Sequence, residues 1–194
     1  MIEYKKSQKI LLKSKIKISD EKIFVKKSLN RISAKNLNSP VNYPAGNNSA
    51  FDGYAIRSNE TVGLNKKNIK KFKILKTLAA GDNPEIKNIR KFSSVEIMTG
   101  ALIPKYFDTV IPIEEISFYP NKKKPKFILI NKKIQKNKHV RFSGSDYKKG
   151  ERVIKKGQII QPNHVLAFKT LGIQKVLVKK KPKIAFYTTG NEIV

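Results

Sequence analysis

The stretch Ser93–Ile113, SSVEIMTGALIPKYFDTVIPI, contains two short apolar runs separated by a loop of small and polar residues. The runs VEIM and TVIPI are typical of core strands, because aliphatic residues dominate them and neither contains lysine. Between them, Thr99, Gly100 and Pro104 are residues that favour turns and loops. The stretch therefore predicts a β core in which a small-residue loop follows the end of a strand.

The same pattern of short runs between turn residues extends from Phe72 to Val178 and predicts a mostly β region. It is interrupted at Asn163–Ile173, where an N-cap candidate, an apolar stripe and a glycine stop predict a helix. A short helix is also expected over Tyr4–Ser14, which contains neither proline nor glycine. The segment Lys22–Leu37 is expected to form a strand followed by a short helix.

These elements place the chain in the α+β class, with mostly β content. We expect residues 6–49 and 137–180 to form one elongated α+β domain, into which residues 50–136 are inserted as a compact β domain. Residues 181–194, KPKIAFYTTGNEIV, read as a buried strand that runs into a glycine turn. Such a strand usually opens a helix-covered parallel sheet, so we expect here the truncated start of an α/β domain.

The composition predicts a folded protein of the cytoplasm. With 39% hydrophobic residues among 194, the chain can bury a core, and the absence of cysteine fits a reducing compartment. The apolar run near the N-terminus, Ile10–Leu12, is too short for a signal peptide. No segment approaches the roughly 20 apolar residues of a membrane span. We therefore expect no membrane association.

The charge of the chain is strongly positive, with 42 Lys and Arg against 14 Asp and Glu. A net charge of +28 is typical of proteins that bind nucleic acid or an anionic surface. However, the lysines are dispersed along a sequence that is also rich in Asn and Ile, as codon bias in an AT-rich genome would produce. Dispersed charge attracts anions without recognising them, and this pattern disfavours a dedicated nucleic-acid site.

Five windows of the chain contain neither lysine nor arginine, and most of the acidic residues lie within them. Burial explains the strand-like parts, but AGNNSAFDGYA, AAGDNP, MTGALIP and TTGNE have loop compositions, as does the shorter gap SGSD. Small and acidic loops in a basic protein offer backbone amides and carboxylates to a ligand or to Mg²⁺. For any single loop, a plain turn is the alternative. The windows are 40–56, 77–86, 92–104, 106–121 and 184–194.

Five ordered blocks contain these loops: NNSAFDGYAIR, AAGDNP, EIMTGALIPKYFDTVIPIEE, RFSGSDYKKGERVIKKGQIIQPNHVLAFKTLGIQKVLV and PKIAFYTTGNEIV. In order and spacing, over nearly the whole chain, they resemble the molybdopterin molybdenumtransferase family, which includes MoeA and the E domain of gephyrin. Some positions depart from the family pattern. Phe51 stands where Met is usual, Ser143 and Ser145 where Arg and Glu are usual, and Asn191 where Asp is usual.

The resemblance implies an enzyme of molybdenum cofactor synthesis. Such an enzyme takes adenylylated molybdopterin and molybdate as substrates, inserts the metal into the dithiolene and releases AMP with Mg²⁺. The resemblance also implies a homodimer with its site in a cleft between subunits, and molybdopterin adenylyltransferase as a partner. A pterin-binding α/β domain would begin near Pro182 and continue past Val194.

The resemblance also implies a set of site residues. Carboxylates are hard oxygen ligands for Mg²⁺, and a Thr-Gly pair can offer a hydroxyl and a backbone N–H to an anion. The alternatives are a hairpin turn at Asp52-Gly53, a strand exit at Thr99-Gly100, an Asx-turn at Asp146 and a solvated acid at Glu192. The implied catalytic residues are Asp52, Thr99, Asp146 and Glu192; the cofactor-binding residues are Ser49, Gly53, Gly100, Thr189 and Gly190; the metal ligands are Asp52 and Glu192.

Two other classes of function remain open from the sequence. A basic β-rich RNA-binding module would place aromatic residues between lysines on one sheet face, whereas the ten Phe and seven Tyr are scattered and the most organised loops are acidic. A non-catalytic dimeric scaffold is also compatible with the resemblance to gephyrin. Ligand binding distinguishes the scaffold from the enzyme.

Overall fold

The computed structural model describes residues 2–14 and 16–187. It divides the chain into two compact units, of which unit 1 comprises Met1–Ser39 and Glu151–Val194, and unit 2 comprises Pro40–Gly150. The limits expected for the inserted domain, 50 and 136, both lie inside unit 2. Unit 2 extends beyond both expected limits, because two short strands outside them pair with each other: β3 (Asn48–Ser49) and β10 (Val140–Arg141).

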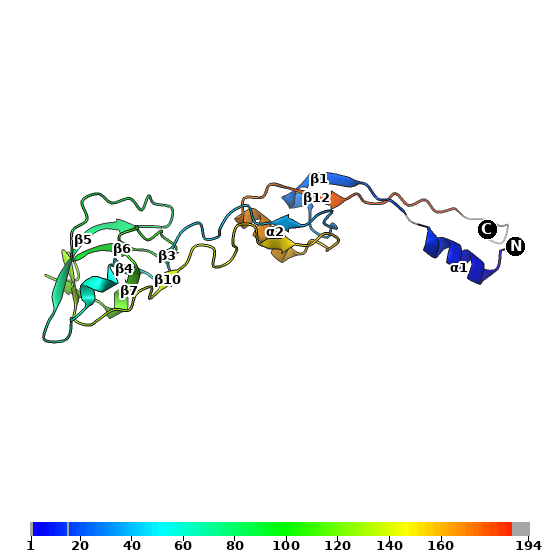
Figure 1. Ribbon diagram of the computed structural model, residues 1–194. Coiled ribbons are helices and arrows are strands. Elements are labelled where there is room, and N and C mark those ends of the chain that lie inside the picture. Colours follow the sequence, from blue (N-terminus) through cyan, green and yellow to red (C-terminus); the bar gives the residue numbers. More distant parts are fainter. Residues whose placement is uncertain (1, 15, 188–194) are drawn as a thin grey trace. The chain divides into compact units, whose positions relative to one another are not determined.

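Unit 2 is built on a six-stranded sheet with the strand order β7-β4-β6-β5-β9-β8. Figure 1 labels four of these strands, β4, β5, β6 and β7. Within it, β5 and β6 are parallel, and all other neighbouring strands are antiparallel. The predicted β region is therefore confirmed. The strands are β4 (Gly53–Ile56), β5 (Lys70–Leu78), β6 (Ser93–Ile97), β7 (Thr109–Pro112), β8 (Ser117–Tyr119) and β9 (Phe127–Ile130).

Two neighbouring strands of this sheet, β4 and the edge strand β7, are buried on both faces. In β4, Tyr54 and Ile56 pack into one apolar cluster and Ala55 into a second. In β7, Ile111 and Val110 divide between the same two clusters. A strand without a solvent face has no position for lysine, so burial accounts for the missing lysines within these strands.

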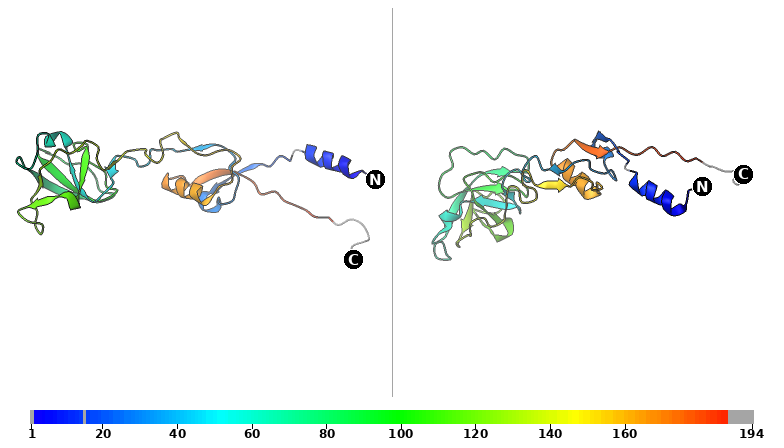
Figure 2. Two further views of the ribbon diagram at one scale, coloured as in Figure 1. Left: turned by 90° about the horizontal axis from the view of Figure 1, so that it is seen from below. Right: turned by 45° about the vertical axis from the view of Figure 1, so that its right-hand side comes forward.

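Unit 1 joins the first and last parts of the chain. Strand β1 (Asp20–Phe24) pairs antiparallel with β12 (Lys175–Lys179), and helix α2 (Pro162–Thr170) lies beside this pair (Figure 2). A second pairing joins the remaining short strands of the unit. The core consists of Val25, Ile154, Ile160, Phe168, Val176 and Val178; the second pair is β2 (Leu37–Asn38) and β11 (Arg152–Ile154).

The predicted helix near Asn163 is confirmed, although Gln161, and not Asn163, is its N-cap residue. Gly172, with φ of 72°, follows its last turn in the left-handed conformation expected of a glycine stop. The helix expected over Tyr4–Ser14 is confirmed as α1 (Tyr4–Lys13), which has no buried residue. The short helix expected after the first strand is only the 3-10 turn η1 (Val25–Lys27).

The strand predicted within residues 181–194 is wrong over its described part. Residues 181–187 form no strand, and Ile184, Phe186 and Tyr187 are 70%, 91% and 87% exposed. A fully apolar strand needs neighbouring strands and covering helices, and the described residues supply none at this end of the chain. Residues 188–194, including the glycine turn, lie outside the described residues. None of the described helices is long and apolar enough to cross a membrane.

The turn between β8 and β9, residues 120–126 (PNKKKPK), is expected to be the first site of cleavage within unit 2. Lys122, Lys123 and Lys124 are exposed, whereas the segment VEIMTGALIP contains core residues such as Val95 and Ile97. Proteases act on exposed loop tips. Limited digestion with subtilisin followed by mass spectrometry should report this order. Initial cleavage inside VEIMTGALIP would contradict the proposal that unit 2 is an independent domain.

Candidate functional site

Three of the lysine-free loops meet at one edge of the sheet in unit 2. Because β5 and β6 run parallel and β4 is antiparallel to β6, the residues that follow β5 and β6 lie beside those that precede β4. The N–H of Met98 donates to the carbonyl of Leu78 at 2.9 Å, and the N–H of Gly100 donates to the carbonyl of Ser49 at 2.9 Å. The blocks AAGDNP, MTGA and SAFD are thereby held together.

Asp52 and Thr99 are in direct contact where these loops meet. The backbone N–H and the hydroxyl of Thr99 both donate to Oδ1 of Asp52, each at 2.7 Å. These hydrogen bonds, first the backbone one, lower the pKa of the exposed Asp52 carboxyl below its ordinary value of 3.8. The site thus contains a carboxylate that is ionised at neutral pH and fixed in orientation through one of its oxygens.

Gly53 is required by the close approach of two strands. A Cβ at this position would lie 2.1 Å from the carbonyl oxygen of Ile111 on β7. Gly53 is the first residue of β4, and the carbonyl of Asp52 accepts a hydrogen bond from the N–H of Ile113 at 3.1 Å. The interpretation of Asp52-Gly53 as a hairpin turn is therefore wrong. Gly53 positions the backbone of its neighbour Asp52.

Thr99 and Gly100 follow the end of β6, so the strand-exit interpretation is confirmed at the level of the backbone. Gly100 has φ of 83°, which directs the chain back toward Ser49. A Cβ on Gly100 would lie 3.8 Å from the side chain of Ala80, in ordinary contact. The conformation of this glycine, more than lack of space, is what the site requires.

The loop that carries Asp52 is held from two sides. Ser49 is buried, and its hydroxyl donates to the carbonyl of Phe51 at 2.5 Å. The N–H of Ala50 donates to the carbonyl of His139 at 3.0 Å, and the rings of Phe51 and His139 meet edge to face with centroids 4.8 Å apart. The Ser49 side chain thus stabilises the loop from within. Phe51 is half exposed beside it.

Asp146 occupies a different part of unit 2. Its carboxylate forms an ion pair with Arg141 and accepts a hydrogen bond from the hydroxyl of Ser145 at 3.3 Å. Its N–H donates to the carbonyl of Tyr43 at 3.0 Å. None of these hydrogen bonds reaches the loop of Asp52. The structure therefore brings Asp52 and Thr99 into contact and ties Asp146 to the segment that precedes them.

The remaining expected site residues, Thr189, Gly190 and Glu192, lie outside the described residues. Of the two expected metal ligands, only Asp52 is described. In residues 2–14 and 16–187, no group of three His, Cys, Asp or Glu side chains could hold a metal ion. The described part of the chain thus provides one carboxylate toward a metal site.

Sequence reasoning missed a second carboxylate near this edge, Glu96 on β6. It accepts hydrogen bonds from the hydroxyl of Thr77 at 2.5 Å and from the hydroxyl of Tyr54 at 3.3 Å. Burial, together with the charge of Glu96 and the hydrogen bond to it, raises the pKa of Tyr54 to about 12. The signal in the sequence was the single acid inside the apolar run VEIM.

Replacing Thr99 with Val is expected to raise the pKa of Asp52 toward 3.8 without reaching it. Val keeps the β-branched shape and the backbone N–H, and it removes only the hydroxyl donor to Oδ1. An NMR titration of the Asp52 carboxyl in both proteins measures the change. Because the pKa of Asp52 is lower in the folded state, its ionisation stabilises the folded state at pH values above the unfolded-state pKa. This contribution is lost as the pH falls through the folded-state pKa. An unchanged pKa in Thr99→Val would contradict the assignment.

The chain matches known proteins over most of its length. A family model described as the MoeA N-terminal region (domain I and II) matches residues 2–172. The chain belongs to this MoeA family. The molybdopterin molybdenumtransferase of Staphylococcus aureus (strain Mu50) is 33% identical over 172 residues, which are 89% of this chain and 40% of that protein. The enzyme of the same name from Staphylococcus epidermidis (strain RP62A) is 30% identical over 193 residues, covering 100% and 45%.

Solved MoeA structures also match the fold. The molybdopterin biosynthesis MoeA protein from Pyrococcus horikosii aligns with a TM-score of 0.81 at 29% identity over 92% of this chain and 44% of that one. A structure of the MoeA protein from Pyrococcus horikoshii OT3 aligns with a TM-score of 0.75 at 30% identity over 84% and 42%. The MoeA fold is therefore shown for this chain, which spans less than half the length of these relatives.

Proposed function

We propose that this chain supplies the N-terminal part of a molybdopterin molybdenumtransferase. In this reaction molybdate enters the dithiolene of adenylylated molybdopterin, and water hydrolyses the phosphoanhydride bond between the pterin phosphate and AMP. The observation that carries the proposal is the Asp52 and Thr99 pair at the sheet edge, in a chain of the MoeA family. Because the chain covers only 40% to 45% of the curated relatives, the activity needs segments that they have elsewhere.

In this proposal, Asp52 is the catalytic carboxylate and Thr99 positions it. The two hydrogen bonds to Oδ1 fix the plane of the carboxylate and keep it ionised. No further hydrogen bond to Asp52 side-chain oxygens is formed in the described part of the chain, which leaves Oδ2 for water or substrate. A preorganised charge of this kind avoids the cost of reorientation during reaction. The N–H of Gly100 is used by Ser49, so Gly100 contributes shape to the site.

Asp52, the expected metal ligand that the structure describes, has the chemistry that Mg²⁺ prefers. Asp52 is an exposed, ionised carboxylate with an oxygen available, and Mg²⁺ is commonly bound through one or two carboxylates together with substrate phosphates. When bound, Mg²⁺ would offset negative charge on the phosphate oxygens of the substrate. We propose Asp52 and Glu192 as its ligands, with Asp146, Thr189 and Gly190 as further contributors to the complete site.

The proposal includes the assembly expected from the family resemblance. A homodimer would complete the site across subunits, and molybdopterin adenylyltransferase would hand over the adenylylated substrate; location in the cytoplasm fits the absence of cysteine. The scaffold alternative shares the dimer but predicts no dependence of any reaction on Asp52. Membership of the MoeA family and the acidic edge of the sheet both favour the enzyme over an RNA-binding module.

A chimaeric enzyme tests the proposal. It joins this chain to the part of the Staphylococcus aureus relative that follows the matched region. We expect it to release AMP from adenylylated molybdopterin in a molybdate-dependent reaction, and the parent enzyme is the positive control. A chimaera that folds, as judged by circular dichroism and a cooperative thermal transition, yet releases no AMP would contradict the proposed function.

A further inference from the structure

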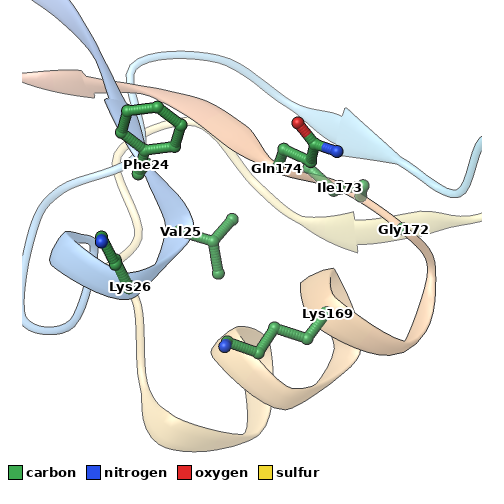
Figure 3. A pocket seen from close by; sticks show the side chains of 7 residues that line it. All are labelled: Phe24, Val25, Lys26, Lys169, Gly172, Ile173 and Gln174. Atoms are coloured by element: carbon green, nitrogen blue, oxygen red, sulfur yellow. The ribbon is translucent and has the colours of Figure 1, made fainter.

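Unit 1 contains a cavity of about 500 Å³ that the proposed reaction does not use. It lies between the 3-10 turn η1 and the end of helix α2 (Figure 3), and Phe24, Val25 and Ile173 provide apolar surface. Val25 is buried, whereas Phe24 is 48% exposed. The remaining lining residues are Lys26, Lys169, Gly172 and Gln174.

The border of this cavity is positively charged. Lys26 on η1 and Lys169 on α2 both line it, and the ammonium of Lys175 lies 4.7 Å from the centre of the Phe24 ring. No acidic residue is among the lining residues. Within the described residues, neither Lys26 nor Lys169 forms an ion pair, whereas Arg31 and Lys179 of the same unit do. The cavity therefore combines an apolar floor with unpaired cations.

A free strand edge ends at the same cavity. The N–H of Val25 donates to the carbonyl of Gln174, and the N–H of Lys180 donates to the carbonyl of Ser19, both at 2.9 Å. In an antiparallel pair the inward and outward backbone groups alternate, so Lys22 and Phe24 direct theirs away from β12. As the N-cap residue of η1, Phe24 uses its C=O in the first hydrogen bond of that 3-10 turn. In the described part of the chain, no strand pairs with the outer edge of β1, and no loop hydrogen bond involves the N–H of Phe24 or the backbone groups of Lys22. An edge of this kind is a template for an added strand.

From these three features we infer that the outer edge of β1 and the cavity at its end form a docking site for an extended acidic segment of a partner protein. The segment pairs its backbone with Lys22 and with the N–H of Phe24, and it places one apolar side chain on Phe24, Val25 and Ile173. Its carboxylates then lie beside Lys26 and Lys169. This inference concerns unit 1 and does not depend on the proposed reaction in unit 2.

The chemistry favours a peptide over the other anions that a basic surface attracts. A peptide strand satisfies the free N–H and C=O groups of β1, and alternate side chains reach the pocket, as in other strand-addition complexes. A nucleic acid would use the cations but leave the strand edge unpaired. The charged side chains of Asp20 and Lys22 disfavour pairing between the β1 strands of two copies of this chain. They still permit pairing with a partner segment whose sequence suits them.

The test uses the complete 194-residue chain and a fluorescein-labelled ten-residue peptide in which Thr and Val flank a central Glu-Leu-Glu. Fluorescence anisotropy measures affinity for the chain and for the double variant Lys26→Glu, Lys169→Glu. Both lysines are exposed, so the variant should fold. The matched control is Lys122→Glu, Lys123→Glu in the exposed turn of unit 2. We expect the pocket variant to bind about tenfold more weakly or worse and the control to bind nearly as well as the parent chain.

Two further measurements identify the mode of binding. Hydrogen exchange followed by NMR should show that the peptide protects the amides of Lys22 and Phe24. A peptide with Pro at alternate positions lacks half of the N–H donors and should not bind. Equal weakening in both charge variants, or unchanged exchange at Lys22 and Phe24, would overturn the inference. The inference would also be overturned if an oligouridylate bound more tightly than the peptide and its binding depended on Lys26 and Lys169.

Discussion

The substitution Asp52→Asn is expected to lower molybdate-dependent AMP release by the chimaeric enzyme by about 100-fold or more, the usual scale for losing one preorganised charged or polar group. Asn keeps an Oδ1 atom that can accept both hydrogen bonds from Thr99, so the loop should keep its conformation. What disappears is the negative charge, since the Asp52 carboxyl, with a pKa below its ordinary value of 3.8, is ionised at neutral pH. The thermal midpoint should change by less than about 2 °C, because the substitution is exposed and near-isosteric.

The matched control for this experiment is Glu114→Gln. Glu114 is an exposed acid in η3 (Ile113–Glu115), next to Ile113 but with its side chain directed to solvent. The same charge is removed from the same unit, and AMP release should stay within about twofold of the parent value, as for surface changes away from a site. Full activity in Asp52→Asn, or an equal loss in the two variants, would show that Asp52 has no specific part in the reaction.

The substitution Gly53→Ala is expected to reduce the free energy of unfolding by about 3 kcal/mol or more, the upper range for overpacking a core. The new Cβ would lie 2.1 Å from the carbonyl oxygen of Ile111, and backbone cannot move aside as a flexible side chain can. β4 is paired with β6 on one side and β7 on the other, so relief of the clash must break hydrogen bonds. Urea denaturation of the 194-residue chain measures the loss.

Gly63 provides the comparison for this substitution. A Cβ at Gly63 meets no atom within 4 Å, but its φ of 79° is unfavourable for a side chain. Gly63→Ala should therefore cost only about 1 kcal/mol, the strain of one left-handed residue. If the two variants lost equal stability, steric contact with Ile111 would not be the reason for glycine at position 53.

Local sequence patterns correctly predicted the elements whose signal lies within a short stretch of residues. The apolar runs around Val95 and Val110 are strands, and the glycine stop at Gly172 ends a helix, because burial and backbone conformation are encoded at those positions. The strand predicted for the last segment was wrong over its described residues, 181–187. Its apolar composition is that of a strand whose partners must come from elsewhere, and a local pattern cannot report whether those partners are present.

The candidate site was predictable in its chemistry and less so in its contacts. The small-residue loops around Asp52 and Thr99 were visible because lysine is missing from them, and the structure joins those two residues directly. The role of Gly53 was not visible, since only the register between β4 and β7 reveals the approach of Ile111. Pairing of residues far apart in sequence depends on topology, which short motifs do not contain.

The central claim is that this chain carries one half of a composite site, and a mixing experiment tests it most directly. The purified 194-residue chain is assayed for molybdate-dependent AMP release alone, and then with a separately produced C-terminal portion of the Staphylococcus aureus relative. We predict no turnover by either part alone, turnover that saturates with added chain, and none when the added chain carries Asp52→Asn. Turnover by the chain alone, or equal turnover with the Asp52→Asn chain, would contradict the account.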